Sequence, residues 1–129
     1  MVRALFAASG VLGFVGVALG AFGAHGLSGK LGSLPDFATR MDWWQKGSQY
    51  NLVHAVAVAV AAWLGSRGAG GAATVAGWCF VAGVALFSGS LYAMTLTGLR
   101  GLGAVTPFGG LLFLAGWAAV VVAALRLPR

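Results

Sequence analysis

Formal charges divide this chain into four long uncharged stretches. With histidine counted as neutral, they are residues 4–29, 47–66, 68–99 and 101–125. A helix needs about 20 predominantly apolar residues to cross the hydrocarbon core of a bilayer. Each stretch therefore allows one crossing, and the short links leave no room for an extramembrane domain.

This segmentation predicts an all-α fold, an integral membrane four-helix bundle formed by residues 1–129 as one domain. We expect spans near residues 4–24, 48–65, 72–96 and 106–125. An even number of spans places both chain ends on one side of the membrane. Cytoplasmic loops are usually enriched in Lys and Arg, but four such residues fall on each side here, so the orientation stays open.

The composition excludes several classes of protein. Of the 129 residues, 60% are apolar and only 8% are charged, whereas a typical soluble domain has about 25% charged residues. So few charges cannot cover a soluble globule, which excludes a soluble enzyme, a disordered chain and a coiled coil. The net charge of +6 comes from cations scattered singly, so we expect no nucleic-acid binding.

Residues 35–47 precede the second span and, unlike the spans, carry charges. Opposite charges lie four residues apart there, as in Asp36 and Arg40. The apolar residues on one face of a helix are Phe37, Met41 and Trp44. The pattern predicts a short amphipathic segment lying in the membrane interface between helices 1 and 2. The alternative is a capped N-terminal extension of the second span.

Small residues recur on one face of several spans. Their alternating spacing of four and three in the first span favours a left-handed helix crossing, and small residues let helix backbones approach closely in lipid. The residues expected at helix–helix contacts are Ser9, Gly13, Gly16, Gly20, Gly23, Gly83, Gly109, Gly116 and Ala123. The fourth span opens with Thr106 and Pro107, typical of an N-cap followed by a proline.

Seven polar residues lie toward one end of the spans. They are His25, Tyr50, Asn51, His54, Ser88, Ser90 and Tyr92. Because successive spans are antiparallel, these positions approach the same membrane face, and we expect them to converge in a polar pocket below the interface. Ionisable groups inside a membrane are costly and often functional. The structural alternative is that each group is satisfied by a nearby carbonyl, hydroxyl or water, or lies in an interfacial belt.

No catalytic pattern accompanies these residues. The chain has no carboxylate pair within the spans, no Ser-His-Asp arrangement, no CxxCH motif, and no zinc-ligand spacing beside the histidines. The first interpretation is a protein without enzymatic activity, cofactor or metal, which lies in the lipid bilayer and forms a homo-oligomer or joins a larger membrane complex. Two alternatives remain. One is a haem- or metal-binding redox or sensor protein that uses His25 and His54, and the other is a carrier of protons or small solutes.

Four short motifs occur in order along the chain. They are residues 20–27 (GAFGAHGL), 49–55 (QYNLVHA), 87–92 (FSGSLY) and 106–110 (TPFGG). In these motifs the chain resembles the domain-of-unknown-function 423 family, small bacterial inner-membrane proteins similar to eukaryotic transmembrane protein 256. The resemblance implies a four-helix, multi-pass protein of the bacterial inner membrane. It implies no activity, cofactor or catalytic residue.

Overall fold

The computed structural model describes residues 1–129 and contains helices and turns but no strand. Four long helices are joined by short connections that include one short α-helix and one 3-10 helix. In chain order the elements are α1 (Val2–His25), α2 (Leu27–Leu31), α3 (Phe37–Ser66), α4 (Gly71–Thr97), η1 (Arg100–Ala104) and α5 (Thr106–Leu125). The all-α fold class expected from the sequence is thus present.

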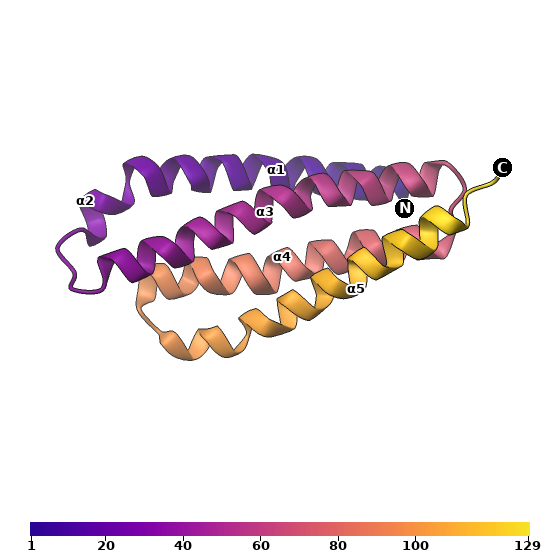
Figure 1. Cartoon of the computed structure of the whole chain (residues 1–129). Helices are drawn as coiled ribbons and strands as arrows, with labels where there is room; N and C mark the ends of the chain where they lie inside the picture. Colours follow the sequence, from indigo (N-terminus) through magenta and orange to yellow (C-terminus); the bar gives the residue numbers. More distant parts are fainter.

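The long helices form a row in which each packs against its neighbours in the sequence (Figure 1). The helix α3 packs on both α1 and α4, while α5 packs on α4. The edge helices α1 and α5 are not packed on one another, so the row is not closed into a ring. Both chain termini lie at one end of the elongated molecule (Figure 1).

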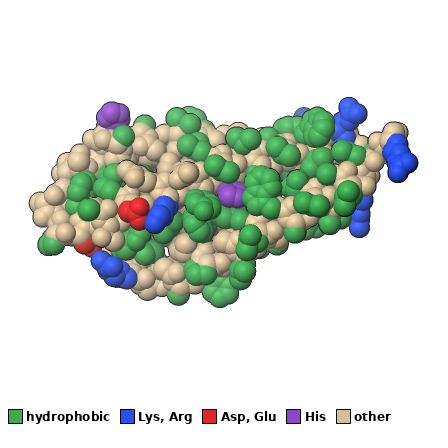
Figure 2. All heavy atoms as spheres, viewed as in Figure 1, with side chains coloured by type: hydrophobic (Ala, Val, Ile, Leu, Met, Phe, Trp, Pro, Cys, Tyr) green, Lys and Arg blue, Asp and Glu red, His purple; other side chains and the backbone are tan.

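Three helical segments are long and apolar enough to cross a membrane: α1, α4 and the stretch Arg100–Leu125 that contains α5. The helix α3 is not among them, and polar residues such as Asn51 and His54 explain its lower apolar content. Only 11% of the most apolar stretch of α1 is buried within the protein. Large apolar side chains cover much of the surface (Figure 2). Such a surface suits lipid rather than water.

The segment 35–47 differs from the expectation. It is not a separate interfacial helix, because residues from Phe37 onward belong to the single 30-residue helix α3. The short helix between α1 and α3 is α2, which lies earlier in the chain. The sequence pattern predicts a helix over residues 37–47, and no residue in this segment breaks the helix before residue 48. Residues 37–47 are instead the N-terminal part of α3, as the alternative expected, but the N-cap residue Asp36 makes no side-chain capping bond.

The start of α5 also differs from the expectation. Thr106 is the first helical residue rather than the N-cap, which is Val105. The Thr106 hydroxyl lies 2.6 Å from the Ser90 hydroxyl and therefore links α5 to α4. At the C-terminus of α4, Gly98 adopts the left-handed conformation with φ of 73°, which ends that helix.

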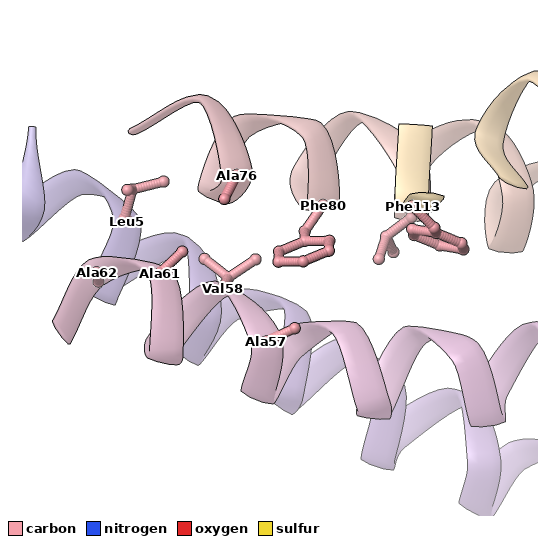
Figure 3. Packing of buried hydrophobic residues seen from close by; sticks show 9 residues of the cluster. Leu5, Ala57, Val58, Ala61, Ala62, Ala76, Phe80 and Phe113 are labelled. Carbon is pink, nitrogen blue, oxygen red and sulfur yellow. The ribbon is translucent and has the colours of Figure 1, made fainter. Parts of the chain in front are cut away.

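The main core lies between α3 and α4 (Figure 3). Alanines on the two facing helices leave space that is filled by two phenylalanines, Phe80 of α4 and Phe113 of α5. The nine buried residues of this core are Leu5, Ala57, Val58, Ala61, Ala62, Ala76, Phe80, Val84 and Phe113. Small residues permit close helix approach, and in lipid this packing stabilises association.

Candidate functional site

Glycines of α1 form its contact with α3. A methyl group added at Gly16 would lie 2.7 Å from Leu52, one at Gly20 would lie 3.0 Å from the Ser48 hydroxyl, and one at Gly23 would overlap Trp44. A side chain at Gly23 would overlap the Trp44 ring, whereas one at Gly16 or Gly20 would require Leu52 or Ser48 to move. Gly13 has no such neighbour within 4 Å, so it lies outside the contact.

Side-chain donors cross from one helix to the other along this same contact. The Trp44 Nε1–H donates to the carbonyl of Leu19 at 2.8 Å, and the Ser48 hydroxyl donates to the carbonyl of Gly16 at 3.3 Å. In the opposite direction, the Ser9 hydroxyl of α1 donates to the carbonyl of Ala55 at 2.8 Å. Close approach at the glycines brings the backbone carbonyls within reach of these donors.

A groove of about 350 Å³ runs along the α1–α3 contact near the His25 end of α1. Small residues of α1 form one wall, and longer side chains of α3 form the other. Its lining residues are Gly20, Gly23, Ala24, Met41, Trp44, Gln45, Ser48, Gln49 and Leu52. Gln45 and Gln49 are exposed and lie one helical turn apart, so two amide groups border an otherwise mostly apolar groove.

A second polar cluster lies between α3 and α4. The Ser88 hydroxyl donates to the carbonyl of Gly47 at 2.7 Å, and the Asn51 Nδ2 donates to the Tyr92 hydroxyl at 3.0 Å. Asn51 is only 1% exposed, and its Oδ1 has no hydrogen-bond partner. Buried amide oxygens are normally paired, so this atom can accept one further hydrogen bond.

His54 lies in an aromatic cluster between α3 and α5. Its ring stacks on Phe113 with centroids 3.6 Å apart. Its Nδ1 lies 2.8 Å from the carbonyl of Tyr50, and its Nε2 accepts the Trp117 Nε1–H at 3.1 Å. This arrangement fits a neutral imidazole with the hydrogen on Nδ1, because one ring nitrogen donates and the other accepts. Both nitrogens of His54 are therefore occupied.

The seven expected pocket residues do not form one pocket. Asn51, Ser88 and Tyr92 lie between α3 and α4, whereas Tyr50 and His54 face α5. His25 is exposed at the end of α1, and the two histidines form separate patches (Figure 2).

Helix geometry explains two of these separations. Residues two apart on a helix lie about 200° apart around its axis. Because Gly23 faces α3, His25 points away from it. Because Ser88 faces α3, Ser90 faces α5, where its hydroxyl pairs with that of Thr106.

The glycines of α4 and α5 form a third contact. A methyl group added at Gly83 would lie 2.5 Å from Phe113, and one at Gly116 would lie 2.5 Å from Phe80. Gly109 lies directly against the backbone of α4 at Phe87. Ala123 is fully buried in a smaller cluster near the chain termini.

Sequence reasoning missed several polar contacts. Trp44 and Trp117 both donate hydrogen bonds across helix contacts, and Arg40 joins the start of α3 to the end of α4. The signal for Trp117 was present, since an indole N–H deep in a span needs an acceptor. The contact of Arg40 depends on how the helices are placed, which no local pattern encodes.

The arrangement does not fit a haem or metal centre built on the two histidines. Ligation through His54 would require breaking one of its two hydrogen bonds, and His25 does not face it. No group of three His, Cys, Asp or Glu side chains is placed to hold a metal ion. The buried polar side chains instead connect helices.

The helical fold, its candidate spans and its apolar surface define a multi-pass helical membrane protein. The chain belongs to the family described as "Protein of unknown function (DUF423)", whose sequence model matches residues 19–110. The resemblance noted in the sequence motifs is thus confirmed.

Two similar proteins support the assignment of the chain to this family of membrane proteins. The chain is 47% identical over 111 residues to the UPF0382 membrane protein YwdK of Bacillus subtilis, covering 85% of this chain and 86% of the relative. It is 43% identical over 131 residues to the UPF0382 inner membrane protein YgdD of Escherichia coli K12, covering 97% of this chain and 90% of the relative. The protein is accordingly one of the bacterial inner membrane. No solved structure matches the chain.

Proposed function

We propose that this protein is a four-span, non-enzymatic accessory or assembly subunit of the inner membrane. The observation that carries this proposal is the use of its buried polar side chains. Ser48, Ser88 and His54 each bond to a neighbouring helix or to their own backbone, and no nucleophile, base and acid converge. Interhelical hydrogen bonds of this kind stabilise membrane bundles.

The chain path supports a fourth span. The helices α1 and α4 are both apolar enough to cross the membrane, and they run in the same direction through the molecule (Figure 1). The chain must therefore return between them, and α3 is the only long helix that does so. Its polar residues Asn51 and His54 are buried against neighbouring helices rather than exposed to lipid.

The groove between α1 and α3 is the proposed docking site for a membrane-embedded helix of a partner subunit. Its small α1 residues permit close approach, and the exposed amides of Gln45 and Gln49 offer hydrogen bonds that lipid chains cannot satisfy. A photo-crosslinking residue at Gln49 should give a specific protein adduct in intact cells. The same residue at Leu114, an exposed position of α5, is the control. Lipid adducts alone at both positions would contradict the docking proposal.

The proposal is tested against the haem and metal alternative by visible absorption and metal analysis. Protein purified in detergent from haem-replete cells should show no Soret band, either oxidised or reduced, and no stoichiometric metal. A band that shifts on reduction and disappears in His54→Ala would overturn the non-enzymatic proposal.

The carrier alternative requires a polar path across the bilayer. The polar clusters of this chain lie at separate helix contacts, and the main core between α3 and α4 is apolar. Liposomes containing the protein should therefore keep background proton and solute permeability. Flux that depends on His54 would favour the carrier instead.

A further inference from the structure

The eight cations of the chain divide equally between the two ends of the molecule, but their surroundings differ. The arginine end carries exposed side chains near the chain termini: Arg3, Arg67, Arg126 and Arg129. The opposite end carries Lys30, Arg40, Lys46 and Arg100. Figure 2 shows blue side chains alone beside the termini, and red and blue side chains together toward the other end.

Both acidic residues lie at the opposite end and pair with its cations. Asp36 forms an ion pair with Arg40 at 3.1 Å and lies 3.7 Å from Arg100. Asp42 pairs with Lys46 at 2.8 Å. The Arg40 side chain is also only 14% exposed. Paired charges largely cancel each other's field beyond about 8 Å at physiological ionic strength.

Packing brings the segments of the arginine end together. A methyl group added at Gly68, next to Arg67, would lie 3.5 Å from Pro128, which adjoins Arg129. One added at Gly65 would lie 3.3 Å from Val2, beside Arg3. The arginine end therefore gathers residues from the two chain ends and the α3–α4 turn, without any acidic side chain.

A tryptophan marks the membrane surface at this end. Trp63 is 51% exposed, and the Arg67 guanidinium lies 6.0 Å from the centre of its ring. Tryptophan is enriched at the level of lipid headgroups. Arginine binds phosphate oxygens through two parallel hydrogen bonds.

We propose that the arginine end binds the headgroups of anionic phospholipids. The unneutralised positive charge and its gathering from three segments match a phosphate-bearing lipid surface. A tryptophan beside an arginine occurs at both ends, as Trp63 with Arg67 here and Trp43 with Arg100 at the opposite end. Anionic lipids give the cytoplasmic leaflet a negative potential. The arginine end and both chain termini therefore face the cytoplasm. The number of cations alone does not determine this orientation, because it is equal at the two ends. The orientation rests on the four-span arrangement proposed above.

The lipid preference is tested with the full chain in detergent at low ionic strength. Native mass spectrometry would count the lipids retained from an equimolar mixture of phosphatidylglycerol and phosphatidylcholine. We expect a preference for phosphatidylglycerol. Each cation near the surface contributes about fivefold, so Arg67→Gln with Arg126→Gln lowers the preference about 25-fold.

The control variant also removes two positive charges, but from the opposite end of the molecule. Lys30→Gln with Lys46→Gln leaves the preference unchanged, because Lys46 is already paired and neither lysine belongs to the arginine end. Equal retention of the two lipids by the unaltered protein would overturn the proposal. An equal loss of preference in both double variants would do so as well.

Thiol labelling tests the orientation separately. In a Cys79→Ser background, Ser33→Cys reports the end opposite to the arginines, and Ser66→Cys reports the arginine end. An impermeant reagent added outside spheroplasts should label only the cysteine at position 33. Labelling only at position 66 overturns the cytoplasmic placement. Labelling at both positions overturns the four-span arrangement and, with it, the orientation. The lipid measurement tests headgroup binding independently of both.

Discussion

At the scale of single residues, His54 is held by two hydrogen bonds and a stacked ring rather than presented to a ligand. Its Nε2 depends on one donor, the indole of Trp117. Trp117→Phe keeps an aromatic ring but removes that donor. Interhelical hydrogen bonds in membranes contribute about 0.6 kcal/mol on average and about 1.7 kcal/mol at most. We expect Trp117→Phe to lower the free energy of unfolding in mixed micelles by an amount within this range.

The matched control for this prediction is Trp63→Phe. The Trp63 indole is half exposed and makes no hydrogen bond within the protein. This variant should leave the unfolding free energy unchanged. An equal loss in both variants would show that ring size, rather than the hydrogen bond to His54, determines the stability.

We expect an added methyl group to have opposite effects on stability at two glycines of α1. Gly23→Ala places a Cβ on the Trp44 ring, and overpacking of this kind costs about 1–3 kcal/mol. Gly13→Ala meets nothing within 4 Å, so it should be neutral or stabilise the helix by up to about 1 kcal/mol. Unfolding of both variants in micelles measures the difference. Equal stabilities would contradict the close α1–α3 contact.

The sequence located the small residues of α1 but not which of them touch a neighbour. Gly13 and Gly16 obey the same repeat, yet only Gly16 lies against α3. A repeat specifies the face of a helix and not where two helices diverge. The proposed meeting of His25 and His54 failed for a different reason. The two histidines are expected at a similar depth in the membrane, but His25 points away from α3 because Gly23, two residues earlier, faces it.

At the scale of elements, the start of α3 is fixed to the end of α4 by Arg40. Its guanidinium pairs with Asp36 and donates to the carbonyl of Thr95 at 3.1 Å, and the Thr95 hydroxyl lies 3.1 Å from the carbonyl of Arg40. Arg40→Met should therefore loosen the first turns of α3. Hydrogen exchange over residues 37–46 should become faster.

The control for this prediction is Lys46→Met. The ion pair of Lys46 with Asp42 is more than half exposed on both sides, and such pairs contribute little to stability. Exchange over residues 37–46 should stay as in the unaltered protein. If Arg40→Met also left the hydrogen exchange of residues 37–46 unchanged, the contacts of Arg40 with α4 would not stabilise the start of α3.

The helices could be predicted from the sequence because charged residues and glycines separate the long apolar stretches. The expected limits of the first, third and fourth spans differ from α1, α4 and α5 by two residues at most. The continuity of α3 was harder to predict. Its N-terminal part is amphipathic in either arrangement, and the amphipathic pattern does not show that residues 37–66 form one continuous helix.

At the scale of the whole molecule, the α3–α4 contact joins two helical hairpins. A chain cut between Gly68 and Gly70 would yield one fragment with α1 and α3 and another with α4 and α5. Because the main core lies between them, the co-expressed fragments should purify together. Ala61→Phe, at a fully buried position, should abolish this association.

The control for the fragment experiment is Val75→Phe, which adds volume at a position of α4 that is 55% exposed. The fragments carrying this change should still purify together. Failure of the unaltered fragments to associate would contradict the central position of the α3–α4 contact.

The open row of helices also bears on how the protein is made. Each main contact joins a helix to the long helix before it. Smaller contacts, such as the hydrogen bond from Trp117 to His54, join helices that are further apart in the chain. Folds dominated by near-neighbour contacts form quickly, because little chain entropy is lost in closing each loop. As each new helix enters the bilayer, its partner is already there. Assembly can therefore follow synthesis step by step, and the final helix completes one edge without rearranging the helices before it.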